Sequence, residues 1–271
     1  SQRVMNILAD SSPDIEIYSI DEAFLDLSDI PLCDLTIYAI ALKQKVLKWT
    51  GIPVSIGIGY SKIQAKAANH LAKTDPEMNG VFSFAALPDP DGYLQKIPVH
   101  DIWGVGEKYA AFFARSGIIN GVDLKYADEN RIREKLGVVG QRLILELNGT
   151  VCYPLNQNPE TKKEICTSRS FGRPLTEYNE LEAATAEYVG KVARKLRNQK
   201  SLAQSILIFI MTNKYDKGPK YVNYKIVKLP VATNQSQELI HYALIALKSI
   251  FMEGYNYKKS GAIVSEAIPD T

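Results

Sequence analysis

Two short apolar runs near the start of the chain have the composition of β-strands. Residues 15–20 and 23–27 are rich in the β-branched and aromatic side chains that strands favour. Asp21 and Glu22 lie between these runs. Neighbouring carboxylates within a strand repel each other and are costly to remove from water. The pattern therefore predicts a hairpin with two carboxylates at its junction.

This carboxylate pair has two interpretations. In the first, it is a polar turn between the hairpin strands. In the second, Asp21 and Glu22 hold a divalent cation that cancels their repulsion. Mg²⁺ suits such hard oxygen ligands, because it usually takes one or two protein carboxylates and completes its shell with water and substrate phosphates. The second interpretation predicts a metal-dependent phosphoryl-transfer site.

Helical spacing of apolar residues follows the hairpin. Asp34 is a candidate cap for a helix that ends near Thr50. One stripe along this helix is apolar and predicts a buried face: Leu35, Ala39, Leu42, Val46 and Trp49. Residues 54–59 then alternate as a strand, and the small residues on one of its faces leave room for another group to approach.

A second helix is predicted over residues 62–73, with Ser61 as its cap. Four polar residues lie within roughly 40° of one line along this helix: Lys62, Lys66, Asn69 and Lys73. We call this line the lysine row. A solvated helix face is one explanation for it. Binding of a triphosphate beside the carboxylate hairpin is the other.

Short helices are predicted for most of the segment 98–150. Within it, Gly104 and Gly106 flank a valine and precede a helix start that contains Lys108, a pattern that resembles a helix-hairpin-helix element. Such glycines let backbone N–H groups approach a phosphate at the positive end of the helix dipole. The alternative interpretation is an ordinary connection between two helices, in which glycines at these positions are also common. A similar pattern recurs at residues 136–140.

The last part of the chain contains one compact pattern of strands and helices. Strands are predicted over 165–174, 202–211, 221–229 and 259–264, with helices over 180–199 and 236–251. This β-α-β-β-α-β order predicts a four-stranded antiparallel sheet with two helices on one face and the other face open. The candidate donors on the open face are Ser168, Arg169, Ser170, Arg173, Lys225 and Lys228.

Charge is distributed unevenly along the 271 residues. The whole chain has a net charge of only +2, yet residues 165–271 hold fifteen Lys or Arg against nine Asp or Glu, a net of +6 that leaves −4 for the remainder. An acidic N-terminal part and a basic C-terminal part are consistent with a metal site followed by a phosphate-binding module. A solvated basic face without a ligand is the alternative.

The cysteines and the hydropathy of the chain indicate its cellular environment. The three cysteines are scattered, with neither metal-ligand spacing nor a disulfide framework, which indicates a reducing, cytoplasmic environment. No apolar run approaches the length that spans a membrane, so no membrane partner is expected.

The order of these motifs resembles that of the Y-family translesion DNA polymerases. Four segments carry the resemblance: 19–26 (Ser-Ile-Asp-Glu-Ala-Phe-Leu-Asp) and 57–73 to the palm, 102–106 (Ile-Trp-Gly-Val-Gly) to the thumb hairpin, and 168–173 (Ser-Arg-Ser-Phe-Gly-Arg) to the little finger. Within the family, residues 3–5, 146–149 and 163–166 resemble the UmuC branch. Each motif is weak alone, whereas four in the right order are specific.

The resemblance implies an α+β fold with three domains. A partial palm with the carboxylate hairpin covers 1–95, and a small helical thumb with the helix-hairpin-helix covers 96–153. A linker over 154–164 leads to a little finger over 165–271. The implied activity is error-prone translesion DNA synthesis in the SOS response to DNA damage, in which nucleotidyl transfer from a deoxynucleoside triphosphate (dNTP) extends a primer 3′ end with two Mg²⁺ ions.

Individual positions match the functional residues of the family. Asp21 matches a metal-binding aspartate, Glu22 the adjacent catalytic glutamate, and Lys73 a lysine that contacts the incoming triphosphate. The positions that the resemblance assigns to DNA binding are Gly104, Gly106, Lys108, Ser168, Arg169, Ser170 and Arg173. The implied partners are primer–template DNA, a dNTP, a UmuD-type accessory subunit, RecA and the sliding clamp.

The chain also departs from the family pattern. A Y-family enzyme begins with a strand that bears another metal-binding aspartate, beside an aromatic steric gate and followed by a fingers domain, and nothing before Ser1 matches these. No clamp-binding peptide follows Thr271. The chain thus resembles an internal fragment that we expect to be inactive alone. The alternative is a non-catalytic DNA-binding protein, that is, a polymerase homologue that has lost its activity. A third candidate, a nucleotide cyclase with a related palm, also has carboxylates at a hairpin. It does not explain the helix-hairpin-helix or the basic C-terminal sheet.

Overall fold

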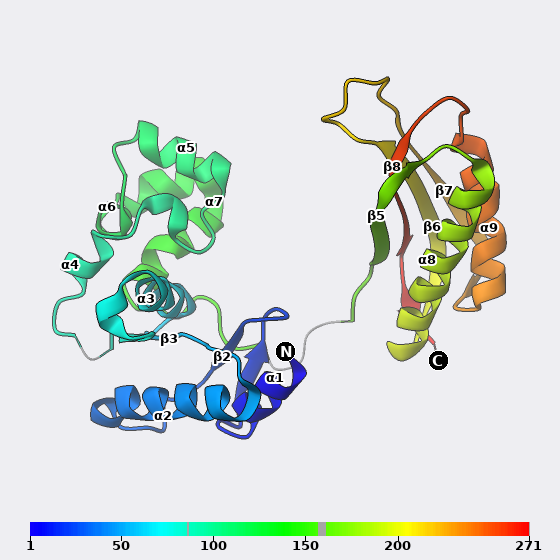
Figure 1. Ribbon diagram of the computed structural model, residues 1–271. Helices are drawn as coiled ribbons and strands as arrows, with labels where there is room; N and C mark the ends of the chain where they lie inside the picture. Colours follow the sequence, from blue (N-terminus) through cyan, green and yellow to red (C-terminus); the bar gives the residue numbers. More distant parts are fainter. Residues whose placement is uncertain (86, 157–160, 271) are drawn as a thin grey trace. The chain divides into compact units, whose positions relative to one another are not determined.

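The computed structural model describes residues 1–85, 87–156 and 161–270. The chain divides into two compact units, residues 1–159 and 160–271, which we call the first and second units (Figure 1). The predicted linker, 154–164, includes residues 157–160, which lie outside the described residues. No helix in the described ranges is both long and apolar enough to cross a membrane.

The first unit begins with a helix and the predicted hairpin. Helix α1 (Gln2–Ala9) precedes strands β1 (Ile15–Ile17) and β2 (Ala23–Leu25), which pair antiparallel. Glu16 lies opposite Phe24 in this pairing. The residues between the strands, Asp21 and Glu22 among them, form the turn.

Helix α2 begins earlier than its predicted cap. It covers Leu32–Thr50, so Asp34 lies in its first turn, while Pro31 occupies the N-cap position. An acidic residue in the first turn is favourable because it faces the positive end of the helix dipole. Four of the five residues in the predicted apolar stripe are buried, but Trp49 is 60% exposed. The prediction that Trp49 belongs to the buried face is therefore wrong: it lies in the last turn of the helix, where the Lys45 ammonium stacks over its ring.

Two parallel strands and a helix complete the first half of this unit. Strands β3 (Ile56–Ile58) and β4 (Val81–Ser83) pair in parallel and are connected by helix α3 (Lys62–Thr74). The Ser61 hydroxyl accepts a hydrogen bond from the Gln64 backbone N–H, 3.1 Å away, as expected for an N-cap. Gly57 is required because a Cβ there would lie 2.1 Å from the backbone nitrogen of Asn69.

The second half of the first unit is helical. Its helices are α4 (Asp91–Leu94), α5 (Glu107–Arg115), α6 (Gly121–Lys125) and α7 (Glu129–Leu147), with short 3-10 helices at Pro76–Met78 and Val99–Asp101. Gly137 has φ 70° and ψ −165°, so it interrupts α7 at the second predicted glycine pattern. One buried cluster joins α3 and β4 to these helices, with Ile63, Phe82, Phe113 and Leu147 among its members.

The second unit is an antiparallel sheet with two helices. Its elements are β5 (Ile165–Leu175), α8 (Tyr178–Asn198), β6 (Ser201–Thr212), β7 (Val222–Thr233), α9 (Ser236–Ile250), β8 (Tyr257–Ser265) and β9 (Ile268–Pro269). The strand order is β5-β8-β6-β7, and β9 pairs with the start of β6. The sheet therefore has five strands where the sequence predicted four, because β9 is too short to show a periodic pattern.

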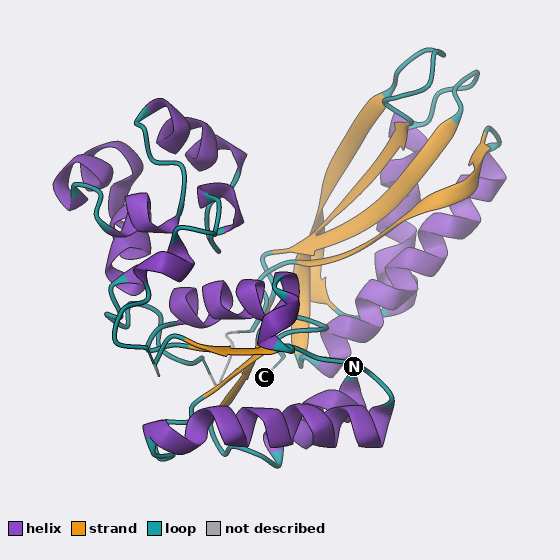
Figure 2. Cartoon of the chain, turned by 60° about the vertical axis from the view of Figure 1, so that its left-hand side comes forward, coloured by secondary structure: helices purple, strands orange, loops and turns teal. Residues whose placement is uncertain are grey.

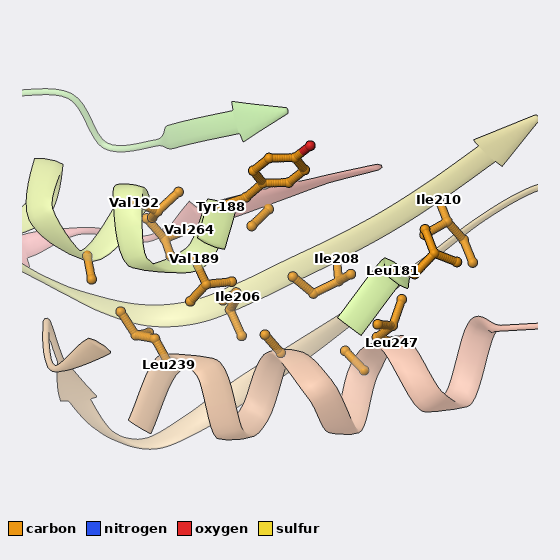
Figure 3. Close-up of a cluster of buried hydrophobic side chains, with 14 of the residues drawn as sticks. Leu181, Tyr188, Val189, Val192, Ile206, Ile208, Ile210, Leu239, Leu247 and Val264 are labelled. Carbon is orange, nitrogen blue, oxygen red and sulfur yellow. The ribbon is translucent and has the colours of Figure 1, made fainter. Parts of the chain in front are cut away.

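The core of the second unit lies between the sheet and its helices. Figure 2 shows both helices along one face of the sheet. Ile206, Ile208 and Ile210 of β6 point at Val189 of α8 and Leu247 of α9, and all five are fully buried (Figure 3). Alternate residues of a strand point to opposite faces. The register therefore fixes which residues reach the open face.

Candidate active site at the carboxylate hairpin

The hairpin turn fixes the two carboxylates by short-range hydrogen bonds. The backbone N–H groups of Tyr18 and Ser19 both donate to the carbonyl of Glu22, each over 3.0 Å. The Ser19 hydroxyl donates to Oδ1 of Asp21 over 2.6 Å. Asp21 is exposed and Glu22 is partly buried. The turn thus presents one carboxylate to solvent and turns the other toward the protein.

The lysine row lies against this hairpin. Lys62 forms an ion pair with Glu16, and Lys66 forms one with Glu22. The Lys62 side chain is only 10% exposed, and its Nζ also donates to the carbonyl of Pro154 over 3.0 Å. The solvated-face explanation is therefore wrong for these two lysines. Lys73, in the last turn of α3, is exposed.

An aromatic cluster holds the other side of the hairpin. The Trp103 ring contacts Tyr18 and Phe24 of the hairpin, with centroid distances of 5.6 and 6.0 Å. Tyr153 lies 6.1 Å from Trp103, and the Lys62 ammonium lies 5.1 Å from the Phe24 centroid. Edge-to-face pairs of this kind contribute about 0.5–1.5 kcal/mol beyond the area that they bury. Sequence analysis placed Trp103 only within a glycine motif and did not find this contact.

The helix-hairpin-helix residues follow Trp103 directly. Gly104 has φ 93°, a conformation that favours glycine, and Gly106 is the N-cap of α5. Both glycines and Lys108, in the first turn of α5, are exposed. The first turn of a helix has backbone N–H groups without intrahelical partners. The predicted phosphate-binding residues therefore lie on the surface at a helix N-terminus, in the same compact unit as the hairpin.

The predicted residues of β5 do not share one face. Ser168 and Ser170 lie opposite Gly261 and Lys259 of β8 and point to the open face. Arg169 lies opposite Ser260, which in turn pairs with the buried Ile210, so Arg169 belongs to the helix-covered face.

The remaining predicted donors are Arg173 of β5 and the two lysines of β7. Arg173 forms an ion pair with Glu180 of α8. Lys225 pairs with the buried Ile208 and also lies on the helix-covered face, whereas Lys228 lies opposite Ser205 on the open one. The prediction that Arg169 and Lys225 line the open face is therefore wrong. The cause is strand alternation, which places adjacent residues on opposite faces.

The donor set of the hairpin fits part of a Mg²⁺ shell. Asp21 and Glu22 offer two hard carboxylate donors, as many as Mg²⁺ usually takes from a protein. No group of three or more His, Cys, Asp or Glu side chains with metal-binding geometry exists among the described residues. Asp26, the next carboxylate along the chain, accepts a hydrogen bond from the backbone N–H of Ser28, and hydrogen bonds from Ser28 lower the pKa of Asp26. Asp26 thus stabilises a turn.

The family models and the curated relatives that match this chain belong to the same family. The impB/mucB/samB family matches residues 1–70, and the impB/mucB/samB family C-terminal domain matches residues 162–271. Protein ImpB of Salmonella typhimurium is 34% identical over 99% of this chain and 64% of that protein. Protein UmuC of Salmonella typhimurium strain LT2 is 36% identical over 98% of this chain and 64% of that protein. The chain thus spans about 64% of the length of these relatives.

A solved structure shares the fold. The Y-family DNA polymerase chimera of Dbh and Dpo4 superposes with a TM-score of 0.70, at 20% sequence identity, over 99% of this chain and 75% of that one. At this identity the likeness concerns the fold.

Proposed function

Because the chain belongs to the impB/mucB/samB family of UmuC-like Y-family polymerases, we propose that it forms part of an enzyme for error-prone translesion DNA synthesis. The reaction is template-directed nucleotidyl transfer from a dNTP to a primer 3′ end. One observation carries the proposal: a turn with two carboxylates lies against a helix whose lysines face it, and both share a compact unit with a glycine-rich helix N-terminus.

Asp21 and Glu22 are the proposed metal ligands. Bound Mg²⁺ supplies charge stabilisation at the attacking and leaving oxygens of an in-line displacement. Glu22 carries the Lys66 ammonium as its counter-ion, so a cation bound at Glu22 takes the place of this ammonium. Asp21 is exposed, and among the described residues its side chain is hydrogen-bonded only to Ser19 of its own turn. It is therefore accessible to a cation.

Phosphate binding is assigned to two further groups of residues. Lys73 at the end of α3 neutralises charge on the dNTP triphosphate. Gly104, Gly106 and Lys108 bind the backbone of primer or template, because exposed N–H groups and a cation at a helix N-terminus favour phosphate. These contacts position the duplex without reading its sequence.

The domain roles follow from the same proposal. Residues 1–95 form the palm, 96–153 the thumb, and 165–271 the little finger. In the little finger, Ser168 and Ser170 contact DNA phosphates from the open face, and the exposed Arg169 and Arg173 do so from the same edge strand, β5. Primer–template DNA and a dNTP are the substrates. A UmuD-type accessory subunit, RecA and the sliding clamp are the proposed partners in the cytoplasm, during the SOS response.

Lesion bypass by the full-length gene product that carries this chain tests the proposal. With a primer that ends one nucleotide before an abasic site, we expect Mg²⁺-dependent addition of a nucleotide opposite the lesion. DNA binding without any incorporation, on damaged or undamaged template, would instead favour the non-catalytic DNA-binding protein.

A second prediction concerns the salt dependence of DNA binding. The second unit has the basic surplus and a core of its own, so we expect residues 160–271 to bind duplex DNA with little sequence preference. With two or more phosphate contacts, Kd should rise at least about tenfold between 50 and 200 mM salt. Fluorescence anisotropy measures both quantities, with residues 1–159 as the comparison. Affinity that is independent of salt, or that resides wholly in residues 1–159, would contradict this assignment.

A further inference from the structure

Glu146 is a fully buried carboxylate in the last turn of α7, with 0% of its surface exposed. Both of its carboxylate oxygens accept backbone hydrogen bonds. Oε2 accepts from the N–H of Ile63 over 3.0 Å, and Oε1 accepts from the N–H groups of Cys152 and Tyr153 over 2.7 and 2.9 Å. An ionised carboxylate is tolerated in such a place only when hydrogen bonds replace its lost hydration. Glu146 is thus held by three donors from two separate segments.

The first segment is the N-terminus of α3. Ile63 is the second residue of this helix, so the Glu146 carboxylate lies where the helix dipole is positive. Two more bonds join the same helix turn to α7: the Ser61 hydroxyl donates to the carbonyl of Glu146 over 2.6 Å, and the Gln64 amide donates to that of Leu147 over 2.9 Å. The start of α3, and with it the origin of the lysine row, is therefore fixed from α7.

The second segment is the turn at Cys152 and Tyr153. Tyr153 reaches the Trp103 ring, which contacts both aromatic residues of the hairpin. Burial raises the pKa of the Cys152 thiol, and the negative charge of Glu146 raises it further. One carboxylate thus anchors both supports of the hairpin: α3, whose Lys66 pairs with Glu22, and the aromatic cluster around Trp103.

From this arrangement we infer that Glu146 is a positioning residue that holds the carboxylate hairpin in its working geometry. It acts through α3 on one side and through Tyr153 on the other, and it does not touch the reacting groups. Its effect on the rate of nucleotide incorporation rests on the proposed polymerase function. Its effect on the mobility of the hairpin does not.

Hydrogen exchange in the full-length protein separates these two effects. In Glu146→Gln, the introduced NH₂ group replaces an acceptor, so at least one of the three backbone N–H groups loses its partner. We expect the Tyr18 and Ser19 amides, which close the hairpin, to exchange at least tenfold faster. Residues 35–46 of α2 should stay within twofold. Glu134→Gln is the matched control, because Glu134 lies on α7 with a largely exposed side chain.

A second variant keeps the test decisive if Glu146→Gln does not fold. Tyr153→Ala removes one support without touching the buried carboxylate, and we expect faster exchange at the same two amides. Hairpin exchange within twofold of the parent protein in the folded variants would overturn the inference. A uniform increase throughout the first unit would also overturn it, since that is the signature of a purely global loss of stability.

Steady-state kinetics then give the catalytic consequence. For Glu146→Gln we expect kcat to fall at least tenfold per active site, with the Kd for DNA and the KM for dNTP within about twofold. A mobile hairpin with an unchanged kcat would overturn the positioning role in catalysis. If neither the parent protein nor any variant incorporates nucleotide while hairpin exchange rises as expected, the polymerase proposal fails and the structural role of Glu146 stands.

Discussion

Replacing both Asp21 and Glu22 with Ala in the full-length protein should abolish primer extension. Without these two carboxylates the protein loses its proposed Mg²⁺ ligands, and we expect kcat to fall at least about a thousandfold, which corresponds to about 4 kcal/mol of transition-state stabilisation. The Kd for primer–template DNA should stay within about twofold, because phosphate contacts elsewhere dominate affinity. Single-turnover incorporation and fluorescence anisotropy measure the two quantities.

Asp26→Ala is the matched control for this pair. Asp26 belongs to the same motif, but its carboxylate accepts a hydrogen bond from Ser28 in a turn. We expect Asp26→Ala to cost a few tenths to about 2 kcal/mol of folding stability through the lost hydrogen bond, with incorporation within a fewfold of the parent rate. If the double variant still extends primers, or if Asp26→Ala is equally inactive, the metal-ligand assignment of Asp21 and Glu22 is wrong.

Sequence reasoning predicts correctly those parts of the first unit whose structure depends on residues close together in the sequence. The hairpin is visible because β-branched residues surround a carboxylate pair, and β1 and β2 form there. Helix α3 begins after Ser61 because a hydroxyl at that position can accept a backbone N–H, and that bond is present. The lysine row is visible because helical spacing is regular. In each case a few neighbouring residues carry the whole signal.

The parts that sequence reasoning misses depend on contacts between distant residues. Glu146 opens the segment 146–149 that resembles the UmuC branch, but that resemblance gives it no role. Its role becomes visible only because the N–H groups of Ile63, Cys152 and Tyr153 converge on it. The faces of Arg169 and Lys225 depend on register, which a one-residue shift inverts.

Tertiary contacts also change the design of one experiment. Lys62 is the natural control for Lys73 by sequence, since both belong to the lysine row. In the structure the Lys62 side chain is only 10% exposed, pairs with Glu16 and donates to the Pro154 carbonyl, so its removal would disturb the hairpin. A lysine that shares only the position of Lys73 in its helix is the better control.

Lys73→Ala in the full-length protein should raise the KM for dNTP or lower kcat at least tenfold, if Lys73 contacts the triphosphate. Tenfold corresponds to about 1.4 kcal/mol of lost stabilisation. A lysine in the last turn of a helix also interacts favourably with the helix dipole, which is worth about 0.3–1 kcal/mol of folding stability. Incorporation kinetics and thermal unfolding distinguish these two roles, because the dipole role changes stability and leaves nucleotide use intact.

Lys48→Ala isolates the dipole contribution. Lys48 is an exposed lysine in the last turn of α2, as Lys73 is in the last turn of α3. We expect both variants to lose a similar small amount of stability, because both remove a cation from the negative end of a helix. Only Lys73→Ala should impair nucleotide use. Equal and small kinetic losses in the two variants would show that Lys73 is a surface lysine, and the triphosphate contact would then have to come from another residue.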